Sequence, residues 1–439
     1  MKLLFMDRHD VHRPWGHVRF RPTPFRPLGR TEMRDVICFA QPRPDGTADV
    51  FHYQMSRHVP WKLLRSVTAD GIRFEDTHLV CERSEYKWHY AARMMYSPEL
   101  ERYIFMKNAI HDGEMQMYIF HSRDGESWEE HPGGPVFADG DAWGAMWSPT
   151  VQRFIYYGKG WQRWDKGGVH DLVLNGRRVV TIRTSQDGFK WTPDTASQYF
   201  EKPEYHNNMR LLRGRLVPIE FQISPDDEDP PDLEFYSGST FAYEGRYYMH
   251  MNNYAGSFIQ PGIDPMRANG HGVFLPCERW ISRDGLNWSR PFREIDAGAF
   301  SLHNPILVNG MMLFQRGDRL HGLPADRLTY ATSTTNSRFE TAEFPMPAGP
   351  LRLNVKIPGD EYDNQENQAY VMAELIDDRD RVIPGYERDG CLLQAPLDRP
   401  DHPLLWQNEG RRRDGSELAG SLVRVRFYAR ASAIYALTA

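Results

Sequence analysis

The chain has 439 residues, of which 40% are hydrophobic and 13% are aromatic, and its formal net charge is -6 at pH 7. A chain of this length has room for one large repeat fold and a smaller domain, and its interspersed charges form no basic stripe for nucleic acid. No stretch approaches the roughly 20 apolar residues of a membrane-spanning helix. We therefore expect neither nucleic acid nor a membrane as a partner.

The beginning of the chain, MKLLFMDRHD, has a short apolar run that Asp7 interrupts. This run is too short for the core of a signal peptide, so a cytoplasmic location is expected unless a leader has been removed. The four cysteines are far apart and form no CxxC pair. Buried free thiols are expected, with disulfides as the alternative. The sequence does not predict an oligomeric state.

A seven-residue phrase recurs along the chain. It reads SRDGESW at 122–128, SQDGFKW at 185–191 and SRDGLNW at 282–288, and looser copies are TADGIRF at 68–74 and STTNSRF at 333–339. The Asp-Gly pair supplies the positive φ angles of a tight turn between two strands, and the final aromatic residue packs between layers. Five copies therefore predict five β-hairpins in a repeat of roughly fifty residues.

A second phrase accompanies the first and consists of a turn followed by alternating aromatic and aliphatic residues. Its copies are QPRPDGTADVFHY, SPELERYIFM, SPTVQRFIYY, FAYEGRYYMH and LVNGMMLFQR. Together the two phrases define units of four antiparallel strands. Five such units predict a five-bladed β-propeller over residues 1–348. Either the strand near residues 2–6 or the segment before Arg30 is expected to complete the last blade.

The repeat phrases are replaced by a different residue pattern after Ala348. Short alternating runs such as LRLNVKI, AYVMAELID and VRVRFYARASAIYAL predict an antiparallel β-sandwich over residues 349–439, either a structural brace or a carbohydrate-binding domain. No helix is expected, so the fold class is all-β. The acidic stretch at residues 224–232 is expected to be a solvated loop, with a structural calcium site as the alternative. No other metal and no organic cofactor is expected.

The five units, the Asp-Gly hairpins and the terminal segments IPGYERDGCLL and ELAGSLVRVRFYARASAIYAL resemble the five-bladed glycoside hydrolases of families 43 and 32. The resemblance implies three carboxylates at the starts of innermost strands. By position it implies Asp35 as base or nucleophile, Asp141 as orienting carboxylate and Glu234 as general acid, with Asp232 competing for the last role. The usual family motifs around these acids are not intact, and His89 stands where an acid is common.

The residues themselves also indicate a site at this end of the propeller, because the loops that enter the inner strands converge on the axis. The alternatives are purely structural roles: an ion pair of Asp35 with Arg34, a solvated loop edge for Glu234 and a structural role for His303. The candidate substrate-binding residues are Arg34, Trp88, His89, Arg93, Trp143, Lys159, Trp161, Arg163, Asp232, Tyr236 and His303.

The expected function is hydrolysis of a glycosidic bond in an oligo- or polysaccharide by a pair of carboxyl groups. One alternative is a polysaccharide lyase that acts on a uronate-containing glycan, with His89 or His303 and a tyrosine such as Tyr236 removing the proton. Another is a propeller that binds glycan without turnover. An ultraviolet-absorbing product would identify the lyase, and glycan binding that is unchanged by Asp141→Asn and Glu234→Gln would identify the binding protein.

Overall fold

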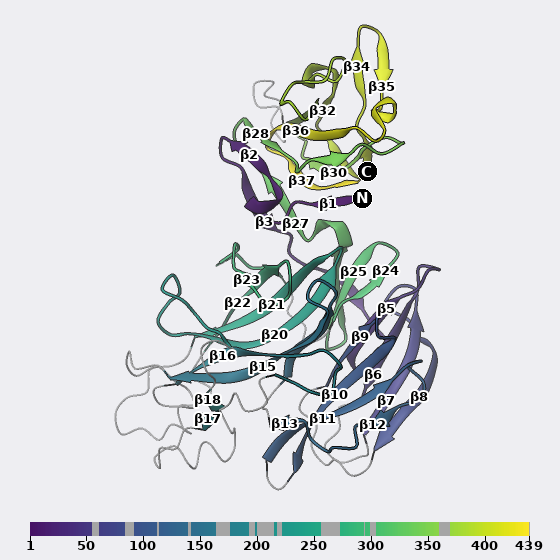
Figure 1. Cartoon of the computed structure of the whole chain (residues 1–439), viewed down its shortest axis with the longest axis vertical. Helices are drawn as coiled ribbons and strands as arrows, with labels where there is room; N and C mark the ends of the chain where they lie inside the picture. Colours follow the sequence, from purple (N-terminus) through teal and green to yellow (C-terminus); the bar gives the residue numbers. More distant parts are fainter. Residues whose placement is uncertain are drawn as a thin grey trace. The chain divides into compact units, whose positions relative to one another are not determined.

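The structure is a computed structural model that describes most of the chain as strands joined by turns. It divides the chain into two compact units, one of Phe25–Gly322 and one of Met1–Pro24 with Leu323–Ala439, shown in Figure 1. The described residues contain no α-helix, which confirms the all-β class. These residues are 1–54, 61–83, 92–111, 114–138, 142–163, 176–192, 198–199, 215–216, 222–255, 273–293, 295–298, 304–359 and 369–438.

The unit of Phe25–Gly322 contains five sheets. The first is formed by β5 (Val36–Pro42), β6 (Ala48–Tyr53), β7 (Trp61–Thr68) and β8 (Glu75–Arg83). The second is formed by β9 (Ala92–Ser97), β10 (Arg102–His111), β11 (Glu114–Ser122), β12 (Glu129–Glu130) and β13 (Phe137–Ala138). The third is formed by β14 (Ala142–Ser148), β15 (Arg153–Arg163), β16 (Gly176–Ser185), β17 (Gln198–Tyr199), β18 (Arg215–Leu216) and β19 (Gln222–Ile223).

The remaining two sheets have four strands each. The fourth is formed by β20 (Leu233–Tyr243), β21 (Arg246–Ala255), β22 (Val273–Ser282) and β23 (Trp288–Ser289). The fifth is formed by β24 (Ile306–Val308), β25 (Met311–Arg316), β26 (Arg319–Pro324) and β4 (Arg26–Arg30). In each of the five sheets, the turn of the second sequence phrase joins the first two strands, as predicted.

Buried side chains join each sheet to its neighbours and close the five sheets into a ring. Phe241 contacts Phe314, and each of four shared core clusters contains residues of two sheets in the pairs Phe51 with Phe105, Met106 with Tyr156, Ile155 with Met249, and Leu313 with Val50. Each pair spans two successive sheets, and the last returns to the first sheet. This arrangement is a five-bladed β-propeller, and the Phe25–Gly322 unit is called the propeller unit below.

The Asp-Gly turns lie between adjacent blades. In the second blade, the Gly125 N–H donates to the Ser122 hydroxyl at 2.8 Å, and the Trp128 indole donates to the Gly125 carbonyl at 2.9 Å. The copies at 185–191 and 282–288 repeat both bonds. A Cβ on Gly188 would lie 2.5 Å from Ile104 of the preceding blade. The positive φ and this close approach explain why the phrase requires glycine.

The expected fifth copy of the phrase, at residues 333–339, does not belong to a blade, and that part of the prediction is wrong. It joins β27 (Thr329–Thr332) to β28 (Ser337–Glu340), which belong to the other unit. The fifth blade instead takes its outer strand, β4, from the beginning of the propeller unit, where β4 pairs with β26. Its third and fourth strands are not joined by a hairpin, so no Asp-Gly turn is needed there.

The other unit consists mainly of two six-stranded antiparallel sheets. One is formed by β1 (Lys2–Leu4), β3 (Arg19–Pro22), β27, β30 (Arg352–Ile357), β33 (Leu397–Pro403) and β37 (Ala433–Thr438). The second is formed by β2 (His12–Trp15), β28, β29 (Phe344–Pro345), β31 (Tyr370–Ile376), β32 (Leu392–Gln394) and β36 (Leu422–Arg430). A small hairpin is formed by β34 (Trp406–Asn408) and β35 (Arg411–Arg413).

These two sheets share one apolar core, to which Leu353 and Leu437 contribute from one sheet and Val371 and Phe427 from the other. The arrangement is a β-sandwich, as expected for the end of the chain. Its bounds differ from the expected division at residue 348. Because β1, β2 and β3 and also β27, β28 and β29 pair within these sheets, the sandwich includes Met1–Pro24 and begins again at Leu323.

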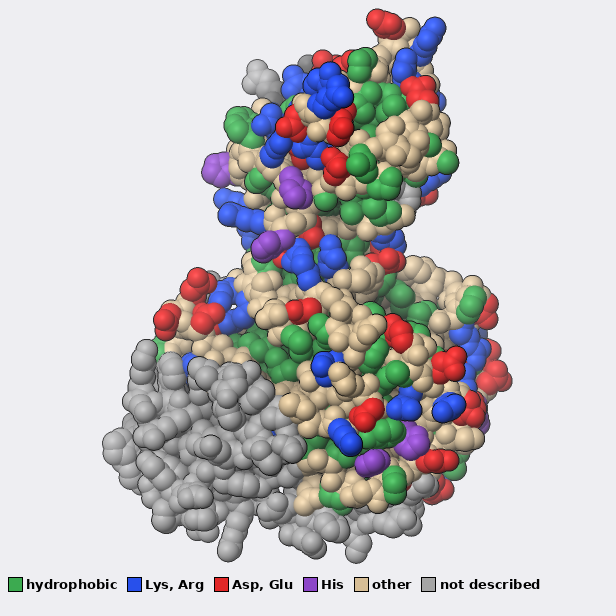
Figure 2. Space-filling model, viewed as in Figure 1, with side chains coloured by type: hydrophobic (Ala, Val, Ile, Leu, Met, Phe, Trp, Pro, Cys, Tyr) green, Lys and Arg blue, Asp and Glu red, His purple; other side chains and the backbone are tan. Residues whose placement is uncertain are grey.

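All four cysteines are buried free thiols, as expected. No helix in the described part of the chain has the length and apolar character needed to cross a membrane. On the face seen in Figure 2, acidic and basic side chains are intermixed over the described surface of the propeller unit.

Candidate functional site

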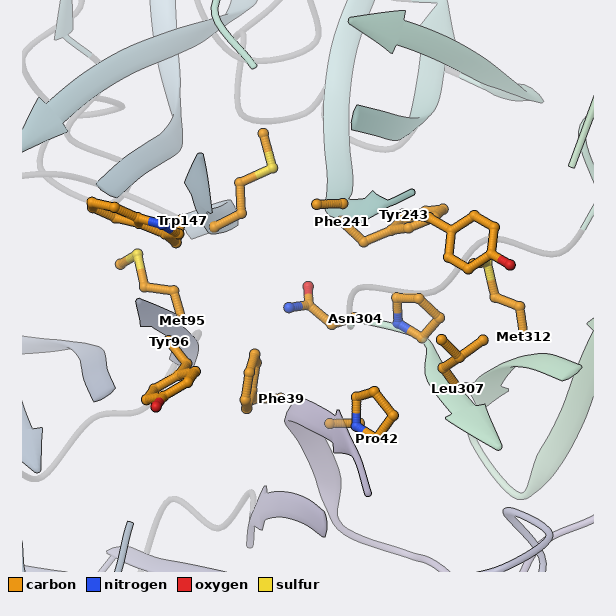
Figure 3. A pocket seen from close by; sticks show the side chains of 14 residues that line it. Phe39, Pro42, Met95, Tyr96, Trp147, Phe241, Tyr243, Asn304, Leu307 and Met312 are labelled. Carbon is orange, nitrogen blue, oxygen red and sulfur yellow. The ribbon is translucent and has the colours of Figure 1, made fainter. Parts of the chain in front are cut away.

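The direction of the five inner strands decides which end of the ring carries the predicted acids. A cavity of about 210 Å³ is lined by Phe39, Tyr96, Trp147, Phe241 and Leu307, one from each of the inner strands β5, β9, β14, β20 and β24. Its lining also includes Pro42 and Tyr243, and Pro42, Tyr96, Trp147 and Tyr243 are the last or next-to-last residues of their strands. Figure 3 shows these side chains around one common space. The C-terminal ends of β5, β9, β14 and β20 therefore meet at one end of the ring, and the starts of these four strands meet at the opposite end.

This cavity is not the predicted acid site. Among the described residues, its lining is mainly aromatic and aliphatic and includes no carboxylate; the Asn304 amide extends into it (Figure 3). Asp35 comes directly before β5, and Glu234 is the second residue of β20. The two acids thus lie at the starts of inner strands, at the end of the ring opposite to the cavity.

Asp35 begins a chain of hydrogen bonds that crosses the first blade. Its Oδ2 lies 2.7 Å from Nδ1 of His52 on β6, and Nε2 of His52 lies 2.7 Å from the hydroxyl of Ser66 on β7. That hydroxyl lies 2.7 Å from the Thr77 hydroxyl on β8. An ionised carboxylate only accepts hydrogen bonds, so Nδ1 of His52 carries the hydrogen that is shared with Asp35.

Along this series of hydrogen bonds, the imidazole is buried while the carboxylate is partly exposed, as a reactive carboxylate needs to be. The His52 side chain is only 3% exposed, whereas that of Asp35 is 20% exposed. Among the described residues, Oδ1 of Asp35 has no hydrogen-bond partner. One oxygen is therefore fixed by a buried imidazole, and the other remains available to a ligand or to water.

The proposed ion pair between Asp35 and Arg34 is absent from the described contacts. Arg34 is exposed, and its guanidinium lies 3.5 Å from Asp318. An exposed pair at this distance contributes little to stability. Arg34 is thus available at the same end of the ring as Asp35.

Glu234 is almost completely buried and forms an ion pair with Arg178 of β16. Its Oε2 accepts hydrogen bonds from the Arg178 guanidinium at 2.6 Å and from the Arg178 backbone N–H at 3.2 Å. The solvated loop edge considered for Glu234 is therefore not what the structure shows. Asp232, which comes just before β20, is half-buried.

Three other candidate residues are described. Arg93 on β9 is buried, and its guanidinium donates to the Ala92 carbonyl at 2.8 Å. Lys159 on β15 is half-buried, and Tyr236 on β20 is 36% exposed. Arg93 and Tyr236 lie at or near the starts of inner strands.

The other candidate residues cannot be placed by their side chains. Asp141, Trp88, His89 and His303 lie outside the described residues. Trp143 lies on β14, and Trp161 and Arg163 lie on β15, but their side chains are outside the description as well.

The acidic stretch before β20 is held by arginines. Asp229 pairs with both Arg290 and Arg293, and Asp226 pairs with Arg293. Arg290 also forms a bidentate pair with Glu278, at 2.9 and 2.8 Å. Among the described residues, no three His, Cys, Asp or Glu side chains are grouped so that they could hold a metal ion.

A buried lysine lies between the first two blades. Lys107 on β10 is fully buried, its amine lies 5.1 Å from the centre of the Tyr53 ring, and no described group accepts a hydrogen bond from it. Burial lowers the pKa of Lys107 to about 7. Burial also raises the pKa values of Tyr53 and Cys38 to about 12, and both groups remain protonated at neutral pH.

His52 and Arg178 were not identified from the sequence. Each is a polar residue within an otherwise apolar or alternating strand, ADVFHY for His52 and GRRVVTIRTS for Arg178. A buried strand rarely contains a charged or titratable residue unless it has a partner. That rule would have marked both residues as buried polar side chains with a partner, without identifying the partner.

No protein-family profile matches the chain, and no curated protein matches it in sequence. Solved structures do match. An α-L-arabinanase of Penicillium chrysogenum complexed with arabinobiose shows 11% identity and a TM-score of 0.37, covering 74% of this chain and 83% of its own. Zg3597, a family 117 glycoside hydrolase of Zobellia galactanivorans, shows 8% identity and a TM-score of 0.36, and the match covers 70% of this chain and 89% of Zg3597.

A fructofuranosidase of Schwanniomyces occidentalis complexed with fructose shows 9% identity and a TM-score of 0.35, covering 95% of this chain and 97% of its own. These three proteins are glycoside hydrolases by description. Because identities and TM-scores are this low, the matches assign neither a family nor an activity to this chain. The propeller assignment rests on the five sheets and the contacts between them.

Proposed function

We propose that this protein is a glycoside hydrolase that cleaves an oligo- or polysaccharide at the end of the ring where the inner strands begin. The observation that carries the proposal is the Asp35 carboxylate, which is fixed through one oxygen by buried His52 and is partly exposed. Hydrolysis of a glycosidic bond needs one ionised carboxylate, as base or nucleophile, and a second carboxyl group that donates a proton.

In this proposal Asp35 is the base or nucleophile. His52 donates a hydrogen bond to Oδ2 and holds the carboxylate in one orientation. Oδ1 faces the sugar or the attacking water. Asp141 is proposed as the orienting carboxylate on the strength of its place before β14 alone.

The proton donor is proposed to come from the start of β20, where Glu234 and Asp232 lie. Glu234 is buried, and its Oε2 accepts a hydrogen bond from the Arg178 guanidinium. Asp232 is half-buried and has no such ion pair among the described contacts. Glu234 is the assigned donor, and Asp232 is the alternative. The variants Glu234→Gln and Asp232→Asn distinguish the two.

The proposal is tested by assaying release of reducing ends from a panel of plant and bacterial polysaccharides. Wild-type protein should cleave at least one of them, and Asp35→Asn should lower the rate at least about a hundred-fold while the protein remains folded. Asp45→Asn is the matched control, because Asp45 lies in the turn at the other end of β5 and its carboxylate accepts hydrogen bonds from Thr47. Turnover that survives Asp35→Asn would contradict the proposal.

A further inference from the structure

Two aromatic side chains are exposed side by side near the start of the fourth blade. Phe274 is 60% exposed and Tyr236 is 36% exposed. Their ring centroids lie 5.0 Å apart, with the ring planes at 84°. Most aromatic side chains of the described propeller unit are buried, so this pair forms a distinct apolar surface.

The pair lies next to Glu234. On β21, Tyr254 is the register partner both of Glu234 on β20 and of Phe274 on β22. The Tyr254 ring lies 5.2 Å from that of Tyr236 and 5.3 Å from that of Phe274. Phe274 therefore occupies the same row of the sheet as the buried carboxyl group, and the Tyr236 ring lies beside it.

The rings are also held in place. The register of β20 shifts between Phe235 and Ser237, so Tyr236 is the extra residue of a β-bulge, a feature that redirects a side chain. The Arg178 guanidinium lies 5.0 Å from the Tyr236 ring and 5.4 Å from the Tyr254 ring. A surface fixed in this way loses little conformational entropy when a ligand binds.

We propose that Tyr236 and Phe274 form a stacking platform for a neutral sugar ring of an oligosaccharide whose scissile bond lies beside Glu234. This inference rests on the proposed function and adds a subsite and a substrate class to it. An aromatic ring has a negative face, which attracts the weakly positive C–H groups on the apolar side of a sugar. Two adjoining rings offer room for about one such sugar.

The charges beside the platform favour a neutral sugar over a uronate. Arg178 is about 1% exposed and already pairs with Glu234, so its charge is compensated within the protein. A carboxylated sugar on the platform would gain no free cation from this pair.

The test measures binding in full-length protein that carries Asp35→Asn, so that ligands stay intact. The probes are oligosaccharides of two to six sugars from arabinan, inulin and xylan, with oligogalacturonates as the charged series, and affinity is measured by calorimetry. Phe274→Ala should weaken binding of the longer neutral oligosaccharides roughly three- to ten-fold. Phe274→Tyr should restore it, and Val273→Ala, at an exposed neighbour without a ring, should leave it unchanged.

Equal unfolding temperatures of the four proteins show that a loss of binding is not a loss of fold. Unchanged affinity in Phe274→Ala overturns the platform, and so does a preference for oligogalacturonates that this change leaves intact. If the wild-type protein cleaves a polysaccharide but Phe274→Ala binds as well as its parent, the platform alone is wrong. If wild-type protein cleaves none and no form binds any saccharide, the proposed function is wrong and the platform falls with it.

Discussion

Oδ2 of Asp35 lies 2.7 Å from Nδ1 of the buried His52 imidazole. The imidazole of β6 therefore contacts the carboxylate that comes directly before β5. His52→Leu removes this hydrogen bond and should lower kcat roughly ten- to a hundred-fold, because a bond to a charged group contributes about 1.5 to 3 kcal/mol. His52→Asn keeps a donor near the Nδ1 position and should recover much of the rate. Steady-state kinetics checks both.

The control for this prediction is His78→Gln, because His78 is exposed on β8 of the same sheet and bonds Glu126. Its kinetics should equal those of the wild type. If His52→Leu retains full kcat in a folded protein, the imidazole does not position Asp35.

Glu234 and Asp232 can be separated by the leaving group of the substrate. A sugar alcohol must be protonated as it departs, whereas dinitrophenolate departs without help. Glu234→Gln should therefore slow hydrolysis of the natural glycoside by about a hundred-fold or more and slow the dinitrophenyl glycoside far less. Asp232→Asn should slow both by less than about ten-fold. The opposite pattern would assign the proton to Asp232.

Gly188 and Gly310 provide a matched pair for the role of the Asp-Gly turns. Both have positive φ, +85 and +71, but a Cβ at Gly310 meets nothing within 4 Å, whereas one at Gly188 lies 2.5 Å from Ile104. Gly310→Ala should lower the free energy of unfolding by about 1 kcal/mol from backbone strain alone. Gly188→Ala should lower it by about 2 to 4 kcal/mol, because two blades must also separate. Urea unfolding measures both free energies. Equal losses in the two variants would contradict a role of the Gly188 turn in the close packing of two blades.

Lys107 predicts a pH dependence of stability with a definite sign. Its pKa falls from 10.5 when unfolded to about 7 when buried, so between these values the unfolded chain binds more protons and stability rises with pH. Lys107→Met removes the buried amine. The variant should exceed wild type in free energy of unfolding by on the order of 4 kcal/mol at pH 6, and this excess should shrink toward pH 10. An excess that does not change with pH would contradict the assignment.

The repeat phrases predict the blades because each turn is local. An Asp-Gly pair flanked by serine and tryptophan forms its own hydrogen bonds, as Ser122 and Trp128 show, and needs no distant partner. The pairing of β4 with β26 is different. It joins residues almost three hundred positions apart, and no short phrase marks either strand. The copy at 333–339 misleads for the same reason, since its local pattern resembles a blade turn while its strands pair within the sandwich.

For the candidate site, the sequence predicted which acids lie at the starts of inner strands but not which side chains contact them. Counting strands placed Asp35 before β5 and Glu234 on β20, and the structure agrees with that placement. The partners of these acids come from other strands, His52 from β6 and Arg178 from β16. Their contacts depend on the register between strands, and in the case of Arg178 on the packing of one blade against the next. A single sequence contains no direct signal for either.

In the proposed reaction, water is added across a glycosidic bond with the help of Asp35. The most direct measurement is digestion of the cleaved polysaccharide in water enriched in oxygen-18, with the products analysed by mass spectrometry and ultraviolet absorbance. Hydrolysis that depends on Asp35 should place one heavy oxygen at each new reducing end and give no unsaturated product, and Asp35→Asn should abolish both labelling and cleavage. Unlabelled, ultraviolet-absorbing fragments, or labelled fragments produced equally well by Asp35→Asn, would contradict it.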